Sequence, residues 1–192
     1  MNVGKKLLFI WVIAMFFITF TCALTYLVAQ QSLRLSANAL PAKLVKDVAI
    51  NLQKGRSAQD SIPSQQVDAS KSDVGFVMIY DQNKHLVATS GMFGTKKPSY
   101  PRGVLDYVAK NGEDRVTWQT PDGLRFATVA MKSNDYYVVG ARSLHETENT
   151  IDQTTHIVFY AWLACLICSA VAMLVIHVFI KALLKKKYVE NL

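Results

Sequence analysis

Cysteine is absent from the long central part of the sequence. The chain of 192 residues has three cysteines, and all of them lie in apolar stretches near the two ends: Cys22, Cys165 and Cys168. The central part therefore has no disulfide bonds available and must fold on its hydrophobic core, for which about 125 residues suffice. Cysteine usage consequently gives no indication of the redox compartment.

A strong excess of positive charge is also missing from the central part. The net charge of the chain is +7, but residues 30–155 carry 15 basic and 13 acidic side chains. Nucleic-acid binding needs a basic stripe on the folded domain, so this near balance disfavours it. Most of the basic excess comes from lysines beside the apolar stretches, namely Lys5, Lys6, Lys181, Lys185, Lys186 and Lys187.

Recognisable catalytic and metal-binding motifs are lacking as well. The sequence contains no G-x-S-x-G, no H-E-x-x-H and no phosphate-binding loop, so it predicts a protein that is not an enzyme and uses no cofactor. Cys165 and Cys168 form a C-x-x-C, but its place in an apolar helix favours helix packing over redox or metal chemistry. His177 is ionisable and lies inside an apolar stretch, so it is a candidate for haem binding or a proton relay. Its position near the lysine-flanked end favours an imidazole that reaches the interface instead.

Two stretches without any charged residue are long enough to cross a bilayer. Residues 7–29 and 157–180 contain no Asp, Glu, Lys or Arg, and at ~1.5 Å per residue each exceeds a hydrocarbon core of ~30 Å. The first stretch is also much longer than the ~7–15 apolar residues of a signal peptide, and no small-x-small cleavage site follows it. An uncleaved anchor is therefore favoured over a signal peptide.

The lysines predict the orientation of both stretches. They stand before the first stretch and after the second, so the positive-inside rule places residues 1–6 and 181–192 in the cytoplasm of a bacterial cell with an inner membrane. Residues 30–156 are then predicted to lie outside the cytoplasm. Aromatic side chains suited to an interfacial belt lie near the predicted outer ends: Tyr26, Tyr160 and Trp162.

The first part of the predicted outer domain shows helical periodicity. Apolar residues recur at three- and four-residue steps over residues 33–52, which predicts a long helix that continues from the first span. Pro41 interrupts this pattern and predicts a kink or a new helix start. Residues 55–73 are polar and predict a loop, with a short helical turn at residues 63–67.

Strand patterns occupy the rest of the outer domain. Five β-rich runs are predicted, with an irregular segment at 91–101 and a short helix at 102–112 between the second and the third. The runs are residues 75–81, 85–90, 114–120, 124–132 and 136–142. This order predicts an α+β fold in which a five-stranded antiparallel sheet carries helices on one face. Residues 143–156 predict a helix that leads into the second span.

Several local sequences resemble a known family. The hairpin IYDQNKHLVATSG has Asp81 at the end of its first strand and Ser90 at the end of its second. A PDG turn follows at residues 121–123, and the segment GARSLHETEN leads into the second span. Together with the two spans, this pattern is similar to the extracytoplasmic PAS-like (single Cache) sensor domains of bacterial sensor histidine kinases and related receptors.

The resemblance implies a ligand pocket between one face of the sheet and the connecting helix and loops. Residues expected there are Arg102, Tyr107, Trp118 and Arg125. An arginine beside aromatic rings suits a small carboxylate, because guanidinium binds carboxylate through paired hydrogen bonds; a small amine is the other ligand class considered. The alternative is that Arg102 caps a helix or forms a salt bridge and that Trp118 belongs to the core.

Two functions remain open from the sequence. The resemblance implies a sensor that passes a signal across the membrane, as in two-component systems. Only residues 181–192 follow the second span, so for a complete chain we expect the output to pass to a separate protein partner; a truncated receptor fits the same sequence. The second hypothesis is a non-enzymatic accessory or assembly subunit that binds a neighbouring protein through its outer domain. A homodimer formed along the helix at 33–52, and packing of that helix on its own sheet, both fit the periodicity.

Overall fold

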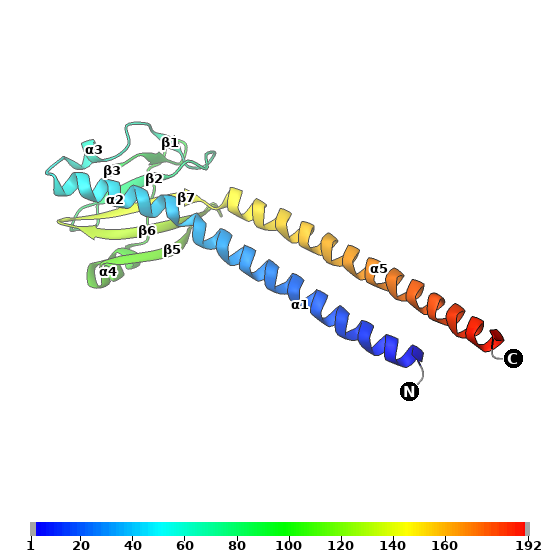
Figure 1. Cartoon of the computed structure of the whole chain (residues 1–192). Helices are drawn as coiled ribbons and strands as arrows, with labels where there is room; N and C mark the ends of the chain where they lie inside the picture. The colour runs from blue at the N-terminus through cyan, green and yellow to red at the C-terminus, as the bar shows by residue number, and fades with distance from the viewer. Residues whose placement is uncertain (1–2, 191–192) are drawn as a thin grey trace. The chain divides into compact units, whose positions relative to one another are not determined.

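The computed structural model describes residues 3–190 and divides into two compact units (Figure 1). One unit consists of Met1–Gln31 with Ile151–Leu192, and the other of Ser32–Thr150. The segments predicted to be cytoplasmic include residues 1–2 and 191–192, and these four residues lie outside the described part of the chain.

The first unit is a pair of helices. Helix α1 spans Val3–Ala37 and helix α5 spans His145–Glu190, and the end of α1 from Ser32 and the start of α5 up to Thr150 belong to the second unit. Both contain stretches long and apolar enough to cross a membrane, and these stretches are not buried by the rest of the chain. The helices lie side by side, and their polar contacts include a hydrogen bond of 3.1 Å from Trp162 Nε1 to Thr19 Oγ1 and one of 3.4 Å between Thr155 and Tyr26.

The second unit contains the remaining helices and all strands between residues 3 and 190. Helices are α2 (Ala39–Gln53), α3 (Ala58–Ser61) and α4 (Arg102–Asn111). Strands are β1 (Val67–Asp68), β2 (Phe76–Tyr80), β3 (Leu86–Thr89), β4 (Gly91–Met92), β5 (Glu113–Gln119), β6 (Arg125–Ser133) and β7 (Tyr136–Ser143). The predicted strands and the predicted helix at 102–112 are thus confirmed to within a few residues.

Five strands form an antiparallel sheet in the order β3-β2-β7-β6-β5. Strand β7 is central and pairs on one side with β2, where Val77 lies opposite Gly140, and on the other with β6, where Val129 lies opposite Gly140. Strands β1 and β4 form a separate parallel pair. The α+β class and the five-stranded antiparallel sheet are confirmed.

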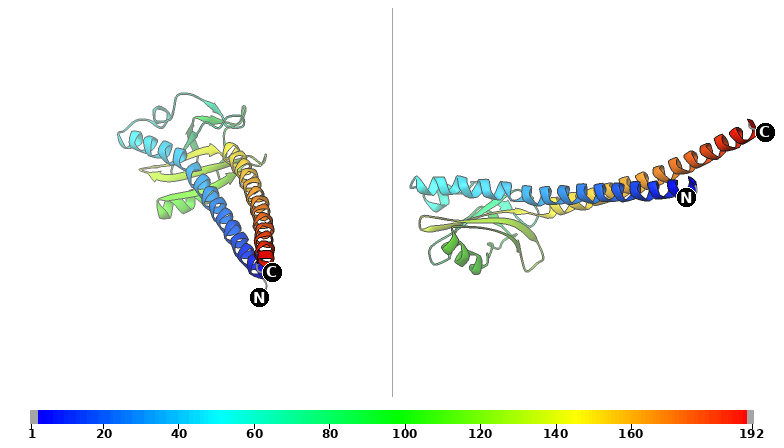
Figure 2. Two further views of the ribbon diagram at one scale, coloured as in Figure 1. Left: turned by 45° about the vertical axis from the view of Figure 1, so that its right-hand side comes forward. Right: turned by 60° about the horizontal axis from the view of Figure 1, so that its bottom comes forward.

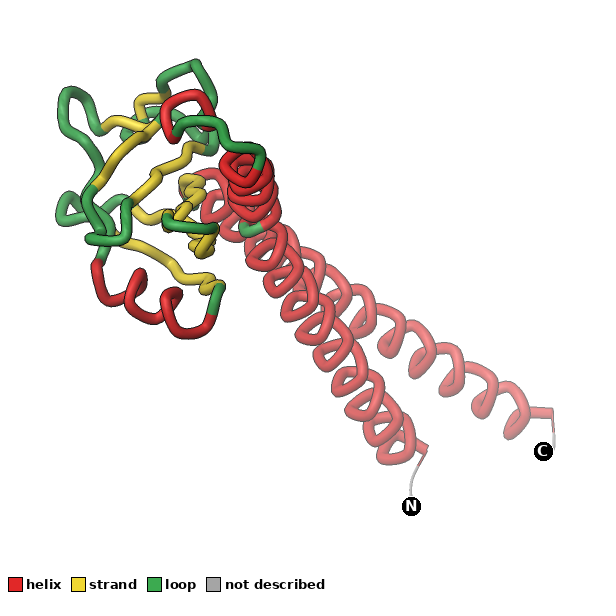
Figure 3. The backbone as a smooth tube through the Cα atoms, turned by 90° about the vertical axis from the view of Figure 1, so that its left-hand side faces the viewer, coloured by secondary structure: helices red, strands yellow, loops and turns green. Residues whose placement is uncertain are grey.

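Both faces of this sheet are covered, so the prediction of helices on one face is wrong. Helix α2 packs on one face, while α4 and the chain around Tyr100 pack on the other (Figures 2 and 3). All five residues of β2 are buried, and they alternate between the two cores: Phe76, Met78 and Tyr80 face one, and Val77 and Ile79 face the other. An unbroken apolar run of this kind is typical of a strand buried on both sides.

Helix α2 begins at Ala39, two residues before Pro41, as the proline predicted. A proline is tolerated there because the first-turn N–H groups of a helix have no partner within it. The buried residues of α2 are Pro41, Val45, Val48, Ala49 and Leu52. They pack on the sheet of the same chain, which is one of the two arrangements that the periodicity allowed.

The loop between α2 and β2 differs from the prediction in detail. The helical turn lies at Ala58–Ser61 and not at residues 63–67. Its start is fixed by Ser57, whose Oγ accepts a hydrogen bond of 3.1 Å from the Asp60 N–H. This arrangement is an ordinary N-cap, and such a cap outweighs the weak helical tendency after Pro63.

Candidate functional site

Aromatic side chains fill the space where the resemblance implied a ligand pocket. Trp118 is 5% exposed, and its ring centroid lies 5.5 Å from that of Tyr100 and 5.4 Å from that of Phe126. Phe93 packs against both Trp118 and Phe126. Trp118 therefore belongs to the hydrophobic core, as the alternative interpretation held.

Two buried tyrosine hydroxyls lie in the same core. The hydroxyl of Tyr100 lies 2.8 Å from Oγ1 of Thr128, which in turn donates to the carbonyl of Val116. The hydroxyl of Tyr80 accepts a hydrogen bond of 3.3 Å from the N–H of Tyr100. Burial raises the pKa of Tyr80 and that of Tyr100 to about 12, because the charged phenolate would lose its hydration.

The four residues predicted to bind a ligand do not converge. Arg102 and Tyr107 lie on α4 with their side chains exposed, because that helix buries Leu105 and Val108 instead. Trp118 is in the core, and Arg125 is exposed at the first position of β6. Of the four, only Arg125 lines a cavity described below, and its ligand-binding role stays a prediction.

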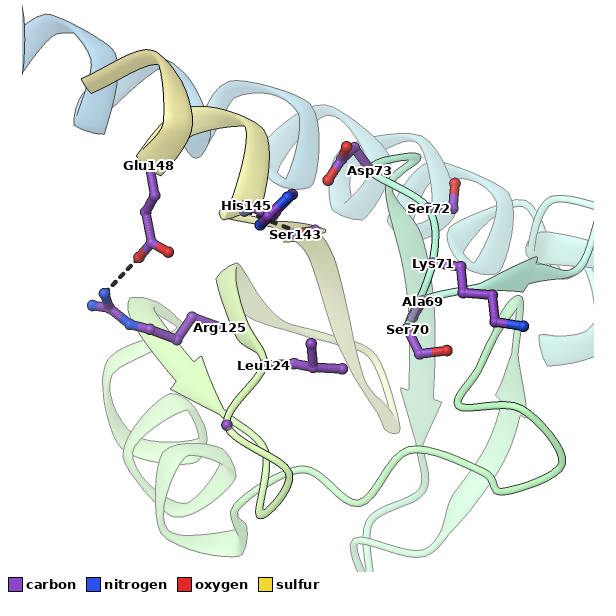
Figure 4. Close-up of a pocket in the computed structure, with 11 residues that line it drawn as sticks. Ala69, Ser70, Lys71, Ser72, Asp73, Leu124, Arg125, Ser143, His145 and Glu148 are labelled. Carbon is purple, nitrogen blue, oxygen red and sulfur yellow. Dashed lines mark hydrogen bonds and ion pairs between the residues drawn. The ribbon is translucent and has the colours of Figure 1, made fainter. Parts of the chain in front are cut away.

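A polar cavity of about 370 Å³ lies where two loops meet the start of α5 (Figure 4). Its wall comes from three segments: the loop after β1, the turn before β6 and the β7–α5 junction. The lining residues are Ala69, Ser70, Lys71, Ser72, Asp73, Gly123, Leu124, Arg125, Ser143, His145 and Glu148. All of them belong to the unit Ser32–Thr150.

The first wall is shaped by Asp68. Its carboxylate accepts hydrogen bonds from the hydroxyl of Ser70 at 2.5 Å and from the N–H of Ser70 at 3.0 Å. These bonds, led by the one from the hydroxyl, hold the pKa of Asp68 below its usual range. The N–H of Ala69 also donates to the carbonyl of Met92 at 2.7 Å, so the loop is tied to β4.

The second wall is the PDG turn. Gly123 has a φ of +85°, which a residue with a side chain rarely adopts, and its N–H donates to the carbonyl of Thr120. The N–H of Thr120 in turn donates to the carbonyl of Leu124 at 2.9 Å. The turn thus fixes the position at which Arg125 enters the sheet.

The third wall is the start of α5, which is bonded to the sheet. The N–H of Leu144 donates to the carbonyl of Arg125 at 2.9 Å, and Ser143 Oγ accepts from the N–H of His145 at 3.2 Å. An ion pair then joins Arg125 Nη1 to Glu148 Oε1 at 2.5 Å. Figure 4 shows this pair on one side of the cavity, and Ser70 and Lys71 on the other.

A second ion pair joins the same helix to the sheet outside the cavity. Arg142 Nη2 lies 2.7 Å from Glu146 Oε2. Neither residue lines the cavity. The first turn of α5 is therefore held by one ion pair within the cavity wall and one beyond it.

The cavity offers groups for a small polar molecule. Lys71 and Arg125 supply positive charge, Asp73 and Glu148 supply negative charge, and hydroxyls come from Ser70, Ser72 and Ser143. A balanced set of this kind can bind carboxylate, ammonium and hydroxyl groups. Within residues 3–190, no group of three His, Cys, Asp or Glu side chains is placed to hold a metal ion.

Sequence reasoning missed most of this site. Residues 69–73 and 143–148 were assigned only as a polar loop and a polar helix. Their meeting depends on the β1–β4 pairing and on the Leu144–Arg125 bond, and both connect distant segments. The PDG turn and the adjacent arginine were the sequence signals that pointed to this end of the sheet.

The other candidates lie in the helix pair. Cys165 and Cys168 are free and exposed on α5. His177 lies beside Gly4, since a Cβ on that glycine would be 3.8 Å from His177 Cε1. A role for any of them in redox, metal or haem chemistry gains no support from neighbouring described residues.

The sequence matches no protein-family model, no curated protein and no solved structure. The resemblance to PAS-like sensor domains therefore stays a prediction. The polar cavity, the continuous helix α5 and the two apolar stretches are the features from which a function can be inferred.

Proposed function

We propose that this protein is a membrane-anchored sensor module. Its unit Ser32–Thr150 lies outside the cytoplasm, and the apolar stretches of α1 and α5 anchor it in the membrane. A small polar molecule, with a carboxylate or an amine, binds in the cavity beside α5. The signal passes to a partner protein in the membrane.

One observation carries this proposal: the cavity wall includes the start of α5. Ser143, His145 and Glu148 line the cavity, and α5 continues without a break to Glu190. The apolar stretch begins at Ile157, twelve residues after His145, or ~18 Å along a helix. A ligand in the cavity thus contacts the same helix that is proposed to cross the membrane.

The placement of charge supports the orientation. Lysines precede the first apolar stretch and follow the second. Short loops and tails rich in Lys and Arg are retained in the cytoplasm. Both apolar stretches lack burial by the rest of the chain, which suits contact with lipid. An inner-membrane location with both termini in the cytoplasm follows from the proposal.

Signalling requires that the ligand prefers one of two states of the domain. A ligand with equal affinity for both states would shift nothing, however tightly it bound. The cavity suits this requirement, because its wall joins two loops to the start of α5. A shift of α5 relative to the loops would change the cavity and so the affinity for the ligand.

A thermal-unfolding screen of the full-length protein in lipid nanodiscs tests the proposal. A panel of small carboxylates and amines is added, and fluorescence of the buried Trp118, after Trp11→Phe and Trp162→Phe, follows unfolding. A ligand at 100 times its Kd stabilises the folded state by about 2.7 kcal/mol, which raises the midpoint by several degrees. Arg125→Gln should abolish the shift, whereas Arg115→Gln, which breaks an ion pair with Glu113 outside the cavity, should keep it. Absence of any shift across the panel would contradict a small-molecule sensor.

The second candidate is an accessory or assembly subunit that binds a neighbouring protein. The observation in its favour is the aromatic packing around Trp118, which occupies the place where the resemblance implied a ligand pocket. Crosslinking and affinity purification from native membranes discriminate between the two functions. A stable complex that survives Arg125→Gln, with no ligand in the thermal screen, would favour assembly.

A further inference from the structure

Glu148 is paired with the guanidinium of Arg125, which is the group that a carboxylate ligand would need. Arg125 is the cavity residue best suited to bind a carboxylate, because its guanidinium can donate two parallel hydrogen bonds. In the structure one of its nitrogens, Nη1, donates to Glu148 Oε1 at 2.5 Å. The cavity therefore already holds a carboxylate, supplied by its own wall (Figure 4).

The pair is placed so that it can be broken. The side chain of Arg125 is 50% exposed and that of Glu148 is 42% exposed. Exposed ion pairs are weak, because water and salt screen both charges and two long side chains must be held in one geometry. A ligand that forms paired hydrogen bonds to the guanidinium can replace a partner attached by a single one.

We propose that Glu148 competes with a ligand carboxylate for Arg125, so that ligand binding breaks one of the two ion pairs that tie the first turn of α5 to the sheet. This inference rests on the proposed function, since it assigns the ligand class and the regulatory contact of the same cavity. The released glutamate can then turn to solvent or to a cationic group of the ligand. The contact between Arg142 and Glu146 lies outside the cavity and stays in place, so the change is confined to the side of the first turn that carries Glu148.

The chain provides a matched control for the test. Glu146 and Glu148 lie two residues apart in the first turn of α5. Glu146 pairs with Arg142 near the end of β7, and Glu148 pairs with Arg125 at the start of β6. Glu146→Gln and Glu148→Gln remove the same charge from nearly the same place. Only Glu148→Gln removes the competitor for Arg125.

Binding of acetate, succinate and glycine to the full-length protein in nanodiscs is measured by isothermal titration calorimetry at constant ionic strength. Glu148→Gln should tighten binding of at least one of these carboxylates by about two- to six-fold, the factor expected when a competing exposed ion pair is removed. Glu146→Gln should leave the affinity within error of the wild type, and Arg125→Gln should abolish binding.

Movement of α5 is measured by double electron–electron resonance. Spin labels are attached to Asn149→Cys and Thr117→Cys, and the three native cysteines are replaced by serine. The carboxylate that binds should broaden the distance distribution in the wild type and in Glu146→Gln. It should add nothing in Glu148→Gln, because the contact that it breaks is already absent.

The outcomes separate this inference from the proposed function. Binding to the wild type that Glu148→Gln weakens or leaves unchanged overturns the competition and leaves the sensor standing. If Glu146→Gln tightens carboxylate binding as much as Glu148→Gln does, the effect comes from the loss of one negative charge near the cavity. That result also overturns the competition. If none of the probes binds any of the four proteins, and none shifts the unfolding midpoint, both proposals fail.

Discussion

Helix α2 approaches strand β7 so closely at Gly140 that a methyl group has no room between them. A Cβ built on Gly140 would lie 2.5 Å from the carbonyl oxygen of Pro41 and 2.9 Å from Cγ2 of Val45. The nearest of these atoms belongs to the backbone of the helix, so a rotamer change cannot relieve the clash. We predict that Gly140→Ala forces α2 away from the sheet and destabilises the unit Ser32–Thr150.

The magnitude follows from two opposed effects. Replacing glycine by alanine stabilises a protein by about 0.4–1 kcal/mol where the backbone permits it, because the unfolded chain loses entropy. Overpacking a filled core costs about 1–3 kcal/mol, and a contact of 2.5 Å with backbone lies at the severe end of that range. The net loss is about 2 kcal/mol, or roughly 6–12 °C in the unfolding midpoint of a domain of this size.

The assay is thermal unfolding of the full-length protein in nanodiscs, followed by Trp118 fluorescence after Trp11→Phe and Trp162→Phe. Gly103→Ala is the matched control, since nothing lies within 4 Å of its new Cβ and the residue is exposed on α4. That change should raise stability by about 0.5 kcal/mol through helix propensity. A Gly140→Ala variant as stable as the wild type would refute the close packing of α2 on β7.

Three further predictions concern other parts of the chain. Because burial raises the pKa of Tyr80 and Tyr100 from 10.0 to about 12, their contribution to stability is fully present below about pH 10 and is lost as the pH rises through 12. Absorbance at 295 nm should show a late tyrosine ionisation that Tyr80→Phe diminishes, and a single transition near pH 10 would contradict it. In a cysteine-free background, Ser99→Cys should react with a membrane-impermeant maleimide in intact cells, and labelling only after lysis would reverse the proposed orientation. Trp162→Phe removes the hydrogen bond to Thr19 and should weaken the helix pair by about 0.6 kcal/mol, measured by unfolding in detergent; an unchanged midpoint would show that this bond contributes nothing.

The sequence predicted elements well where a local signal exists. Leu105 and Val108 with Gly112 as a stop predicted α4, and the run from Phe76 to Tyr80 predicted β2, because periodicity and turn residues act within a few positions. The covering of both sheet faces was missed. The unbroken apolar run of β2 indicates a strand buried on both sides, but it does not indicate which helix covers which face.

The candidate site was predicted less well, because its parts are distant in the sequence. Arg125 lines the cavity, but the sequence grouped it with Trp118, whose side chain lies in the core. Ser70 and Glu148 are ordinary polar residues with no periodicity. Their proximity depends on how β1 pairs with β4 and on how α5 leaves the sheet, and neither relation is visible in a local window.

The position of β7 in the sheet has a mechanical consequence. It is the middle strand, hydrogen-bonded along both edges, and a single residue separates its end at Ser143 from α5. A pull on α5 is therefore delivered to the centre of the sheet, where the ladders to β2 and β6 must slide together before the strand can yield. An edge strand would instead peel away one bond at a time. Tension along α5 is thus shared by both ladders of β7, and the hydrogen bond from the N–H of Leu144 to the carbonyl of Arg125 adds a third connection to the sheet.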